Sequence, residues 1–369
     1  MYIWAEDSWP DFQWNAEALL GPMAEARHRQ GRLLGMMGQL GFDLQLEAEL
    51  KATVEDIVKT SAIEGEHLDP ASVRSSLARR LGLPDAGLTA PDHKIEGLVE
   101  MMLDATRNHA VPLTTERLFG WHAALFPTGY SGLHRIDVGS WRSDRDGPMQ
   151  VVSRPIDRPR VHYQAPPADR IAGEMDRFLA WFNAPPPLDG LLRSSIAHLW
   201  FVTLNPFDDG NGRMARTIAD QVLAQGEGTE HRFYSVSSQI QRERNAYYAI
   251  LKRTQKGNLD ITAWLLWFIG CFGRAIAQAE TMSVEVLRKA EFWRRFAQES
   301  LSARQKAVLN RFLDSFEGNL TARKWAALGK CSVDTAQRDI NDLLVRGLLV
   351  RNPGGSRNTS YTPLMAGGE

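Results

Sequence analysis

The fold of this chain is decided by residues 198–217, which read HLWFVTLNPFDDGNGRMART. The segment starts as a largely apolar run typical of a buried helix, continues as a loop with two carboxylates and a Gly-Asn-Gly, and opens a new helix that carries two arginines. Glycines let backbone N–H groups approach an anion closely, and the N-terminus of the following helix adds its positive dipole end. The segment therefore predicts a helix, a loop and a second helix that together bind an anion.

The charged side chains of this segment suit a polyphosphate. Arg213 and Arg216 are three residues apart, so they lie on one helical face and can reach the same ligand. Asp209 offers a carboxylate that can hold Mg²⁺ between phosphate groups. Taken singly, an Asn-Gly pair more often marks a turn and a charged helix start more often marks a solvated cap. Taken together, these features predict a cradle for a nucleoside triphosphate that is not a Walker loop.

The segment resembles the signature HxFx(D/E)GNGRxxR of the Fic family, whose members transfer AMP from ATP onto hydroxyl side chains of target proteins. The resemblance implies that Mg²⁺ is the cofactor and ATP the substrate. Phe207 would anchor the loop, Asp209 would coordinate Mg²⁺, and the glycines and asparagine would line the phosphates, with both arginines on the outer phosphates. The seven matching positions are Phe207, Asp209, Gly210, Asn211, Gly212, Arg213 and Arg216.

The remaining position of the signature differs, because Asn205 stands where the family has its catalytic histidine. That histidine is taken to remove the proton from the attacking hydroxyl, and a neutral amide has no titratable group for this step. We therefore expect an intact nucleotide site with impaired chemistry. Either the chain is a natural family member without the histidine or the histidine was replaced deliberately, and the otherwise complete motif favours replacement. His198 is expected in the core rather than as a substitute base.

A second motif lies far upstream, at residues 60–66, which read TSAIEGE. Glu64 ends a predicted helix, where the helix dipole disfavours an acid, and Gly65 can cap that helix. The plain interpretation is a solvated glutamate before a glycine cap. However, Thr60, Glu64 and Gly65 match the inhibitory pattern (S/T)xxxE(G/N) of the Fic family. The resemblance implies that Glu64 reaches Arg216 and keeps ATP from seating its γ-phosphate productively.

Two further segments are predicted outside the helical core. Residues 148–163 read as two short strands around a proline-containing turn, where the family has a flap that clamps the target by strand pairing; an ordinary surface hairpin is the alternative.

Residues 318–362 read as two short helices and a strand-turn-strand, the order of a winged helix-turn-helix module, with seven basic residues against three acids. DNA and protein remain equally open as its partner. Its DNA-reading residues would be Ser332, Thr335 and Arg338.

Composition and length limit the remaining possibilities. The helical periodicity of most segments predicts a mainly α protein, and the length of 369 residues indicates more than one domain. The net charge of −1 restricts any nucleic-acid contact to a local patch. Two cysteines cannot form a disulfide framework, and residues 261–273 are too short an apolar run to span a membrane. With no signal peptide at the start, we expect a cytoplasmic protein.

We assign residues 1–90 to an N-terminal helical domain with the inhibitory motif, 91–296 to the Fic core and 297–369 to the winged helix.

Two functional hypotheses follow from the sequence. The first is a Fic-type adenylyltransferase inhibited by Glu64 and disabled by Asn205, with the reverse removal of AMP left open. The second is a DNA-binding regulator whose inactive Fic core senses nucleotide. The sequence leaves open the target protein, the modified residue, the nucleotide preference and the oligomeric state, a homo-oligomer included.

Overall fold

A computed structural model of the chain describes residues 2–38, 40–82, 93–145, 147–153, 160–184, 187–313, 320–353 and 359–364. The chain is mainly helical, as the sequence predicted, with three two-stranded hairpins among the described residues. It divides into two compact units, residues 1–279 and 280–369. The domain boundary expected near residue 90 lies outside the described residues. The boundary expected near residue 296 lies just after the end of α11 (Thr262–Arg295), within unit 2.

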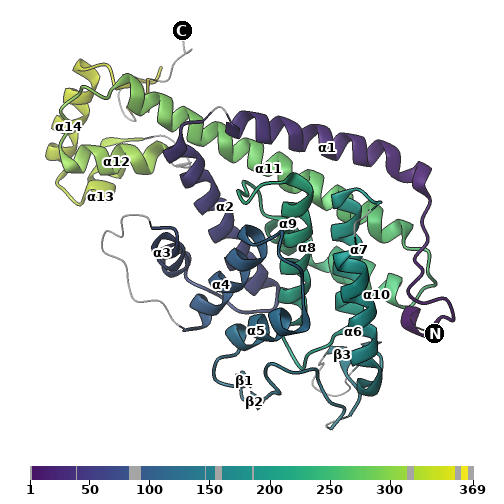
Figure 1. Ribbon diagram of the computed structural model, residues 1–369. Helices are drawn as coiled ribbons and strands as arrows, with labels where there is room; N and C mark the ends of the chain where they lie inside the picture. Colours follow the sequence, from purple (N-terminus) through teal and green to yellow (C-terminus); the bar gives the residue numbers. More distant parts are fainter. Residues whose placement is uncertain are drawn as a thin grey trace. The chain divides into compact units, whose positions relative to one another are not determined.

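Unit 1 holds the helices on which the motif residues lie (Figure 1). Its elements are, in chain order, η1 (Ile3–Ala5), α1 (Ala16–Gly38), α2 (Phe42–Ile63), α3 (Pro70–Arg80), α4 (His93–Arg107), α5 (Thr115–Leu125), β1 (Tyr130–Ser131), β2 (His134–Arg135), β3 (Gln150–Ser153), β4 (Arg160–Gln164), α6 (Ala168–Asn183), α7 (Gly190–Leu204), α8 (Asn211–Glu227), α9 (Val236–Arg242), α10 (Arg244–Gln255) and the first part of α11.

The centre of unit 1 is the pair α7 and α8, with α6 packed on α7 and α4 packed on α8 (Figure 1). The helix α7 is buried on nearly all of its surface, in keeping with its apolar sequence. Trp264 of α11 is fully buried, and its indole N–H donates to the carbonyl of Ser195 in α7 at 2.9 Å. The motif loop therefore leaves one rigid core helix and enters another.

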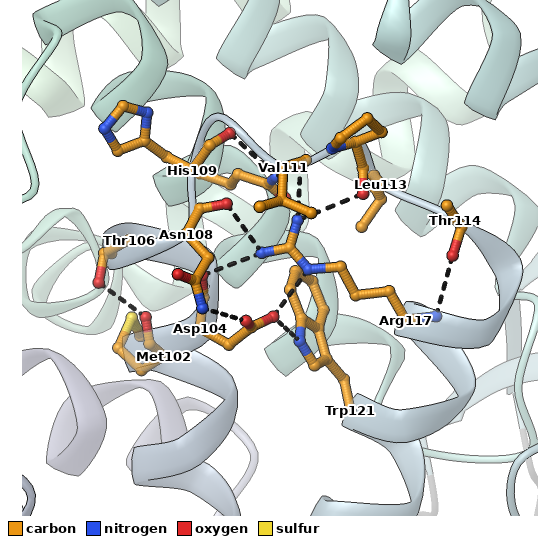
Figure 2. A network of polar contacts seen from close by, with 12 residues as sticks. Met102, Asp104, Thr106, Asn108, His109, Val111, Leu113, Thr114, Arg117 and Trp121 are labelled. Atoms are coloured by element: carbon orange, nitrogen blue, oxygen red, sulfur yellow. Dashed lines mark hydrogen bonds and ion pairs between the residues drawn. The ribbon is translucent and has the colours of Figure 1, made fainter.

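A network around Asp104 joins α4 to α5, as Figure 2 shows. The Asp104 carboxylate accepts from the Arg117 guanidinium at 2.7 Å, from the Trp121 indole at 2.8 Å and from the Asn108 amide at 2.7 Å. Arg117 also donates to the carbonyl of Val111 at 2.7 Å. These contacts fix α5, whose side chains line the motif loop.

The helix α8 is tied to the same region. Gln225 donates to the carbonyl of His109 at 2.7 Å, and Gln221 donates to the carbonyl of Val111 at 3.2 Å. The segment between α4 and α5 therefore bridges the Asp104 network and the helix that carries both motif arginines.

Unit 2 has the order of elements that the sequence predicted. It consists of the end of α11, then α12 (Ala303–Leu313), α13 (Ala322–Gly329), α14 (Val333–Val345), β5 (Leu349–Arg351) and β6 (Tyr361–Pro363), with β5 antiparallel to β6. Trp325 is fully buried in the core of this unit, and its indole donates to Asp339 at 3.1 Å. The turn of the hairpin, at residues 354–358, lies outside the described residues.

Among the described residues, none of the helices combines the length and the apolarity needed to cross a lipid bilayer.

The Asp104 network leads to a stability prediction. Replacing Asp104 with alanine removes the acceptor for three donors, two of them from α5, so Asp104→Ala should lower the free energy of unfolding by about 2 to 3 kcal/mol. Urea unfolding of the full chain measures this. Asp176, which is exposed on α6, supplies the matched control: Asp176→Ala should change stability by no more than about 0.5 kcal/mol.

The same contribution should depend on pH. Burial alone would raise the pKa of Asp104, but hydrogen bonds from Asn108, Arg117 and Trp121 hold that pKa below its ordinary value. A carboxyl whose pKa is lowered on folding stabilises the protein above its unfolded-state pKa, and this stabilisation is lost as the pH falls through the folded-state pKa. The gap between the native protein and Asp104→Ala should therefore shrink below about pH 4. A gap that stays constant down to pH 3 would contradict this account.

Candidate functional site

Asn205 ends α7 in the left-handed conformation, with φ +44° and ψ +62°. Its backbone N–H donates to the carbonyl of Phe201 at 3.0 Å, and its side-chain amide donates to the carbonyl of Val202 at 2.8 Å. Asparagine and histidine are both enriched in this conformation among residues other than glycine. The position at which the signature differs is therefore one whose backbone accepts either residue.

The loop between α7 and α8 is closed by Asn211, the first residue of α8. Its side chain accepts from the backbone N–H of Phe207 at 3.0 Å and donates to the carbonyl of Phe207 at 2.7 Å. Phe207 is fully buried, in agreement with its expected role as an anchor. The helix α8 begins at Asn211, directly after Gly210, whose φ of +79° turns the chain into the helix.

A histidine that the sequence analysis did not single out supports this loop. The ring of His122 in α5 stacks on Phe207, with centroids 4.2 Å apart, and burial lowers its pKa to about 4. Its Nδ1 accepts from the backbone N–H of Gly139, so the neutral ring carries its proton on Nε2 and donates to the carbonyl of Asp209 at 3.2 Å. Stacked and neutral, His122 acts as a support for the loop.

Arg142 is a second residue that the sequence analysis missed. Its buried guanidinium donates to the carbonyl of Asn205 at 2.7 Å and to the carbonyl of Pro166, while its backbone N–H donates to the carbonyl of Pro206 at 2.9 Å. Asp144 supplies the counter-charge at 2.9 Å. The only sequence signal was an arginine in a segment without helical periodicity, which says nothing about the distant carbonyls it contacts.

The two carboxylates of the loop accept hydrogen bonds from different donors. Asp208 accepts from the backbone N–H of Asp137 at 2.8 Å. Asp209, the expected metal ligand, accepts from its neighbour Gly210 N–H at 2.6 Å and from the hydroxyl of Ser131 in β1. The side chain of Asp209 is therefore oriented from two directions, one of them a hairpin that the sequence did not predict.

Arg216 and Glu64 meet, although 152 residues separate them in the chain. The guanidinium of Arg216, which is 2% exposed, donates to the Glu64 carboxylate at 2.8 Å, to the Thr60 hydroxyl at 2.6 Å and to the Thr60 carbonyl at 3.0 Å. A Cβ added at Gly212 would lie 2.2 Å from the nearer oxygen of Glu64. Glu64 therefore sits directly against the N-terminal turn of α8, where an anionic ligand would bind.

The turn that presents Glu64 is a Schellman motif at the end of α2. The N–H of Glu66 donates to the carbonyl of Ser61 at 3.0 Å, and the N–H of Gly65 donates to the carbonyl of Ala62 at 3.1 Å. Gly65 has φ +86°, the left-handed conformation that favours glycine at this position. The predicted glycine cap is thus present.

Arg213 also has an acidic partner from this turn. Its guanidinium lies 2.9 Å from the carboxylate of Glu66 and stands over the ring of Phe126, 5.1 Å from the centroid. Arg213 Nε and Arg216 Nη1 are buried and make no hydrogen bond within the described part of the chain. The motif arginines therefore keep unused donors although each already contacts a carboxylate.

The helix α2 is held against α9 and α10 by polar contacts along its second half. Asp56 accepts from the Ser237 N–H at 3.2 Å and also from the hydroxyl of Ser235, and Glu55 accepts from the hydroxyl of Ser238 at 2.6 Å. Arg244 donates to the carbonyl of Ile63 at 2.9 Å. The position of Glu64 therefore depends on the packing of α2 as a whole and not only on the turn that follows the helix.

His198 is a core residue, as expected. It is fully buried, its Nε2 lies 2.9 Å from the hydroxyl of Tyr247, and burial together with the charge of Arg216 lowers its pKa to about 3.

The predicted hairpin near residues 148–163 is present as β3 and β4, which pair antiparallel with an irregularity between Val151 and Val152. Its turn, residues 154–159, lies outside the described residues. Tyr163 anchors the hairpin by donating its hydroxyl to the carbonyl of Thr203 at 2.6 Å. A cleft beside the hairpin is lined by Gln150, Arg135 and Asp208 among others, so the hairpin borders the motif loop.

The comparisons with known proteins agree with this geometry. Residues 112–223 match the model of the Fic/DOC family, and residues 2–83 match a domain of unknown function, DUF4172. Residues 112–223 form a Fic/DOC family domain. The matched range contains the whole motif loop and both hairpins beside it, whereas Thr60, Glu64 and Gly65 lie within the DUF4172 match.

Individual relatives extend this result. The chain is 24% identical over 233 residues to the protein adenylyltransferase Fic of Nematostella vectensis, a match that covers 61% of this chain and 48% of that protein. The chain thus spans about half the length of that relative. A Fic family protein from Desulfovibrio desulfuricans G20 has a similar fold, with a TM-score of 0.55, 20% identity, and coverage of 96% of this chain and 98% of that one. A Fic domain containing signaling protein from Bacteroides thetaiotaomicron VPI-5482 has a TM-score of 0.54 at 17% identity and covers 71% and 96% of the two chains.

The expected DNA-reading residues lie at the start of α14, away from the Fic domain in the sequence. Ser332 is the N-cap of this helix, and its hydroxyl accepts from the N–H of Thr335 at 3.2 Å. Ser332 and Arg338 are exposed, whereas Thr335 is half-buried.

The loop of the Fic domain yields a testable prediction. Asn211→Ala leaves both backbone groups of the buried Phe207 without their partner, so it should lower the free energy of unfolding by about 2 to 4 kcal/mol. Thermal and urea unfolding measure the loss. Asn245 is an exposed asparagine on α10, and Asn245→Ala should be almost neutral. Equal stability of the two variants would mean that Asn211 does not hold the loop.

Proposed function

We propose that this chain is a protein adenylyltransferase, with Mg-ATP and a Ser, Thr or Tyr hydroxyl of a protein as substrates, which is inhibited by Glu64 and impaired by Asn205. The observation that supports this most directly is the meeting of Arg213 and Arg216 at the glycine-rich N-terminus of α8, with guanidinium donors still unused. Unpaired buried donors are costly, and a polyphosphate supplies the oxygens that would satisfy them.

Asp209 is the proposed Mg²⁺ ligand. A single oriented carboxylate fits an ion that is held mainly by substrate phosphates and water. When bound, the ion would supply positive charge that offsets the negative charge developing on pyrophosphate as it leaves. The hydrogen bond from Ser131 sets the direction of the carboxylate.

The proposed reaction joins a hydroxyl oxygen of the target to the α-phosphorus of ATP and breaks the bond to pyrophosphate. The hydroxyl proton must go to a base, and the amide of Asn205, which donates to the carbonyl of Val202, cannot take it. Arg142 and Phe201 hold the backbone of residue 205 and would do the same for a histidine. The defect is therefore chemical and leaves the loop intact.

Inhibition is proposed to arise because Glu64 and a phosphate compete for one place. The carboxylate of Glu64 lies against Gly212 and is paired with Arg216, so a phosphate that needs these donors must first displace it. A carboxylate in the site also repels the triphosphate. The same Glu64 could activate a water for the reverse removal of AMP, which we propose as a secondary activity.

The hairpin of β3 and β4 is proposed to receive the target protein. Val151, Val152 and Val161 are between 38% and 43% exposed, so β3 and β4 present apolar side chains at the surface. An extended segment of the target could pair with this hairpin over the cleft that Gln150, Arg135 and Asp208 line.

The proposed function is tested by replacing Asn205 and Glu64, first separately and then together. Asn205→His should raise the rate of AMP transfer by about 10² to 10⁴, the usual contribution of a general base. Glu64→Gly should improve seating of ATP yet leave transfer slow, and the double variant should be the most active form. Labelled ATP followed on the protein itself and on lysate proteins measures transfer.

Arg216→Ala in the double variant serves as the control, because it removes the proposed contact with the γ-phosphate and should return the protein to near inactivity. A double variant that labels neither itself nor any lysate protein would falsify the proposed function.

A second candidate function, DNA binding by unit 2, is supported by the exposure of Ser332 and Arg338 at the start of α14 and by the hairpin that follows the helix. The net charge of +4 over residues 318–362 suits a phosphate backbone. In this second candidate function, the Fic domain senses nucleotide and unit 2 acts as a transcriptional regulator.

Duplex binding by the full chain tests the second candidate. Affinity should fall steeply as salt rises, and Arg338→Ala should weaken it while Arg294→Ala, an exposed arginine of α11, should not. If no duplex is shifted at low salt, unit 2 does not bind DNA and a protein partner becomes the better proposal.

A further inference from the structure

We infer that Glu66 is a second inhibitory residue. Its carboxylate pairs with Arg213 and so competes with the nucleotide for this guanidinium, as Glu64 is proposed to do at Arg216. This inference rests on the proposed nucleotide site and adds to it a separate element of control. Its basis is the ion pair between Glu66 and Arg213, whose atoms are 2.9 Å apart.

The geometry of the turn explains how one segment can occupy both arginines. Glu64 and Glu66 flank Gly65, whose left-handed conformation reverses the chain at the end of α2. Both carboxylates consequently face α8, where Arg213 and Arg216 lie one turn apart on the same face. A phosphate that binds both guanidinium groups must therefore compete with two carboxylates.

The two ion pairs differ in their surroundings. Arg216 has further contacts to the hydroxyl and the carbonyl of Thr60, so its pair with Glu64 is part of a network. Arg213 is as deeply buried, at 5% side-chain exposure, but Glu66 is 40% exposed and is its only hydrogen-bond acceptor within the described residues. The Glu66 pair is therefore the weaker and the more accessible to solvent.

Two consequences follow for nucleotide binding. Removing Glu64 alone leaves Arg213 engaged, so the site is only partly released. Removing Glu66 alone frees a guanidinium that already has an unpartnered Nε and takes one negative charge away from the path of the triphosphate. Neither effect needs a movement of α2.

Calorimetric titration of the full chain with Mg-ATP tests the inference. Glu66→Gln should tighten ATP binding by about three- to tenfold, and Glu64→Gln with Glu66→Gln should bind more tightly than either single variant. The gain from Glu66→Gln should diminish at high salt, because a half-exposed charge is screened. Glu17→Gln, at an exposed position of α1, is the matched control and should bind as the native protein does.

Adenosine separates a phosphate effect from a general change of the site. Its affinity should be the same in all variants, because it carries no charge for the carboxylates to repel. Thermal unfolding of Glu66→Gln confirms that the variant is folded.

The outcomes distinguish this inference from the function on which it rests. Tighter ATP binding by Glu64→Gln, with Glu66→Gln unchanged or weaker than the native protein, overturns the role of Glu66 and leaves the proposed function in place. A gain that is equal for ATP and adenosine also overturns it. If none of the variants binds ATP, the nucleotide site itself is wrong, and the inference falls with it.

Discussion

A guanidinium that is buried must be matched by acceptors and by negative charge, and Arg216 imposes this requirement on the centre of the molecule. Its acceptors come from Thr60 and Glu64 at the end of α2, so the N-terminal helical segment is bound to the Fic domain through an arginine of the proposed phosphate cradle. Because Glu64 lies against the N-terminal turn of α8, the same contact that joins the two segments also fills part of the proposed site. A ligand that takes Arg216 from Glu64 must supply equivalent charge, and a phosphate does so.

The loop between α7 and α8 is rigid for reasons that are independent of any ligand. Asn211 closes it on Phe207, His122 stacks on Phe207, and Arg142 holds the carbonyl of residue 205. Each support comes from a different part of the chain. A loop held in this way tolerates a change of side chain at position 205, because the backbone of that residue is fixed by Phe201 and Arg142. This explains how the Fic/DOC domain can have asparagine at position 205 and keep the rest of the motif.

The acidic partners of both motif arginines come from one turn. The Schellman motif after α2 turns Glu64 and Glu66 toward the two arginines of α8, and Gly65 makes that geometry available without strain. Ion pairs therefore join this turn to α8, and the contacts of Asp56 and Glu55 with α9 hold α2 in place. Glu64 and Glu66 belong to the DUF4172 match, whereas the two arginines with which they pair belong to the Fic/DOC match.

Local patterns were sufficient to predict the helical class, the motif loop, the glycine cap after Glu64 and the hairpin of β3 and β4, because each follows from local periodicity, from the turn preferences of glycine and proline, or from a contiguous motif. Tertiary structure alone decided which distant groups complete the site. The contacts of Arg142 with residues 205 and 206, the stacking of His122, the bond from Ser131 to Asp209 and the pair of Glu66 with Arg213 all join segments far apart in the chain. No local pattern encodes such pairings, since the residues that make them are ordinary polar residues until packing removes the water around them.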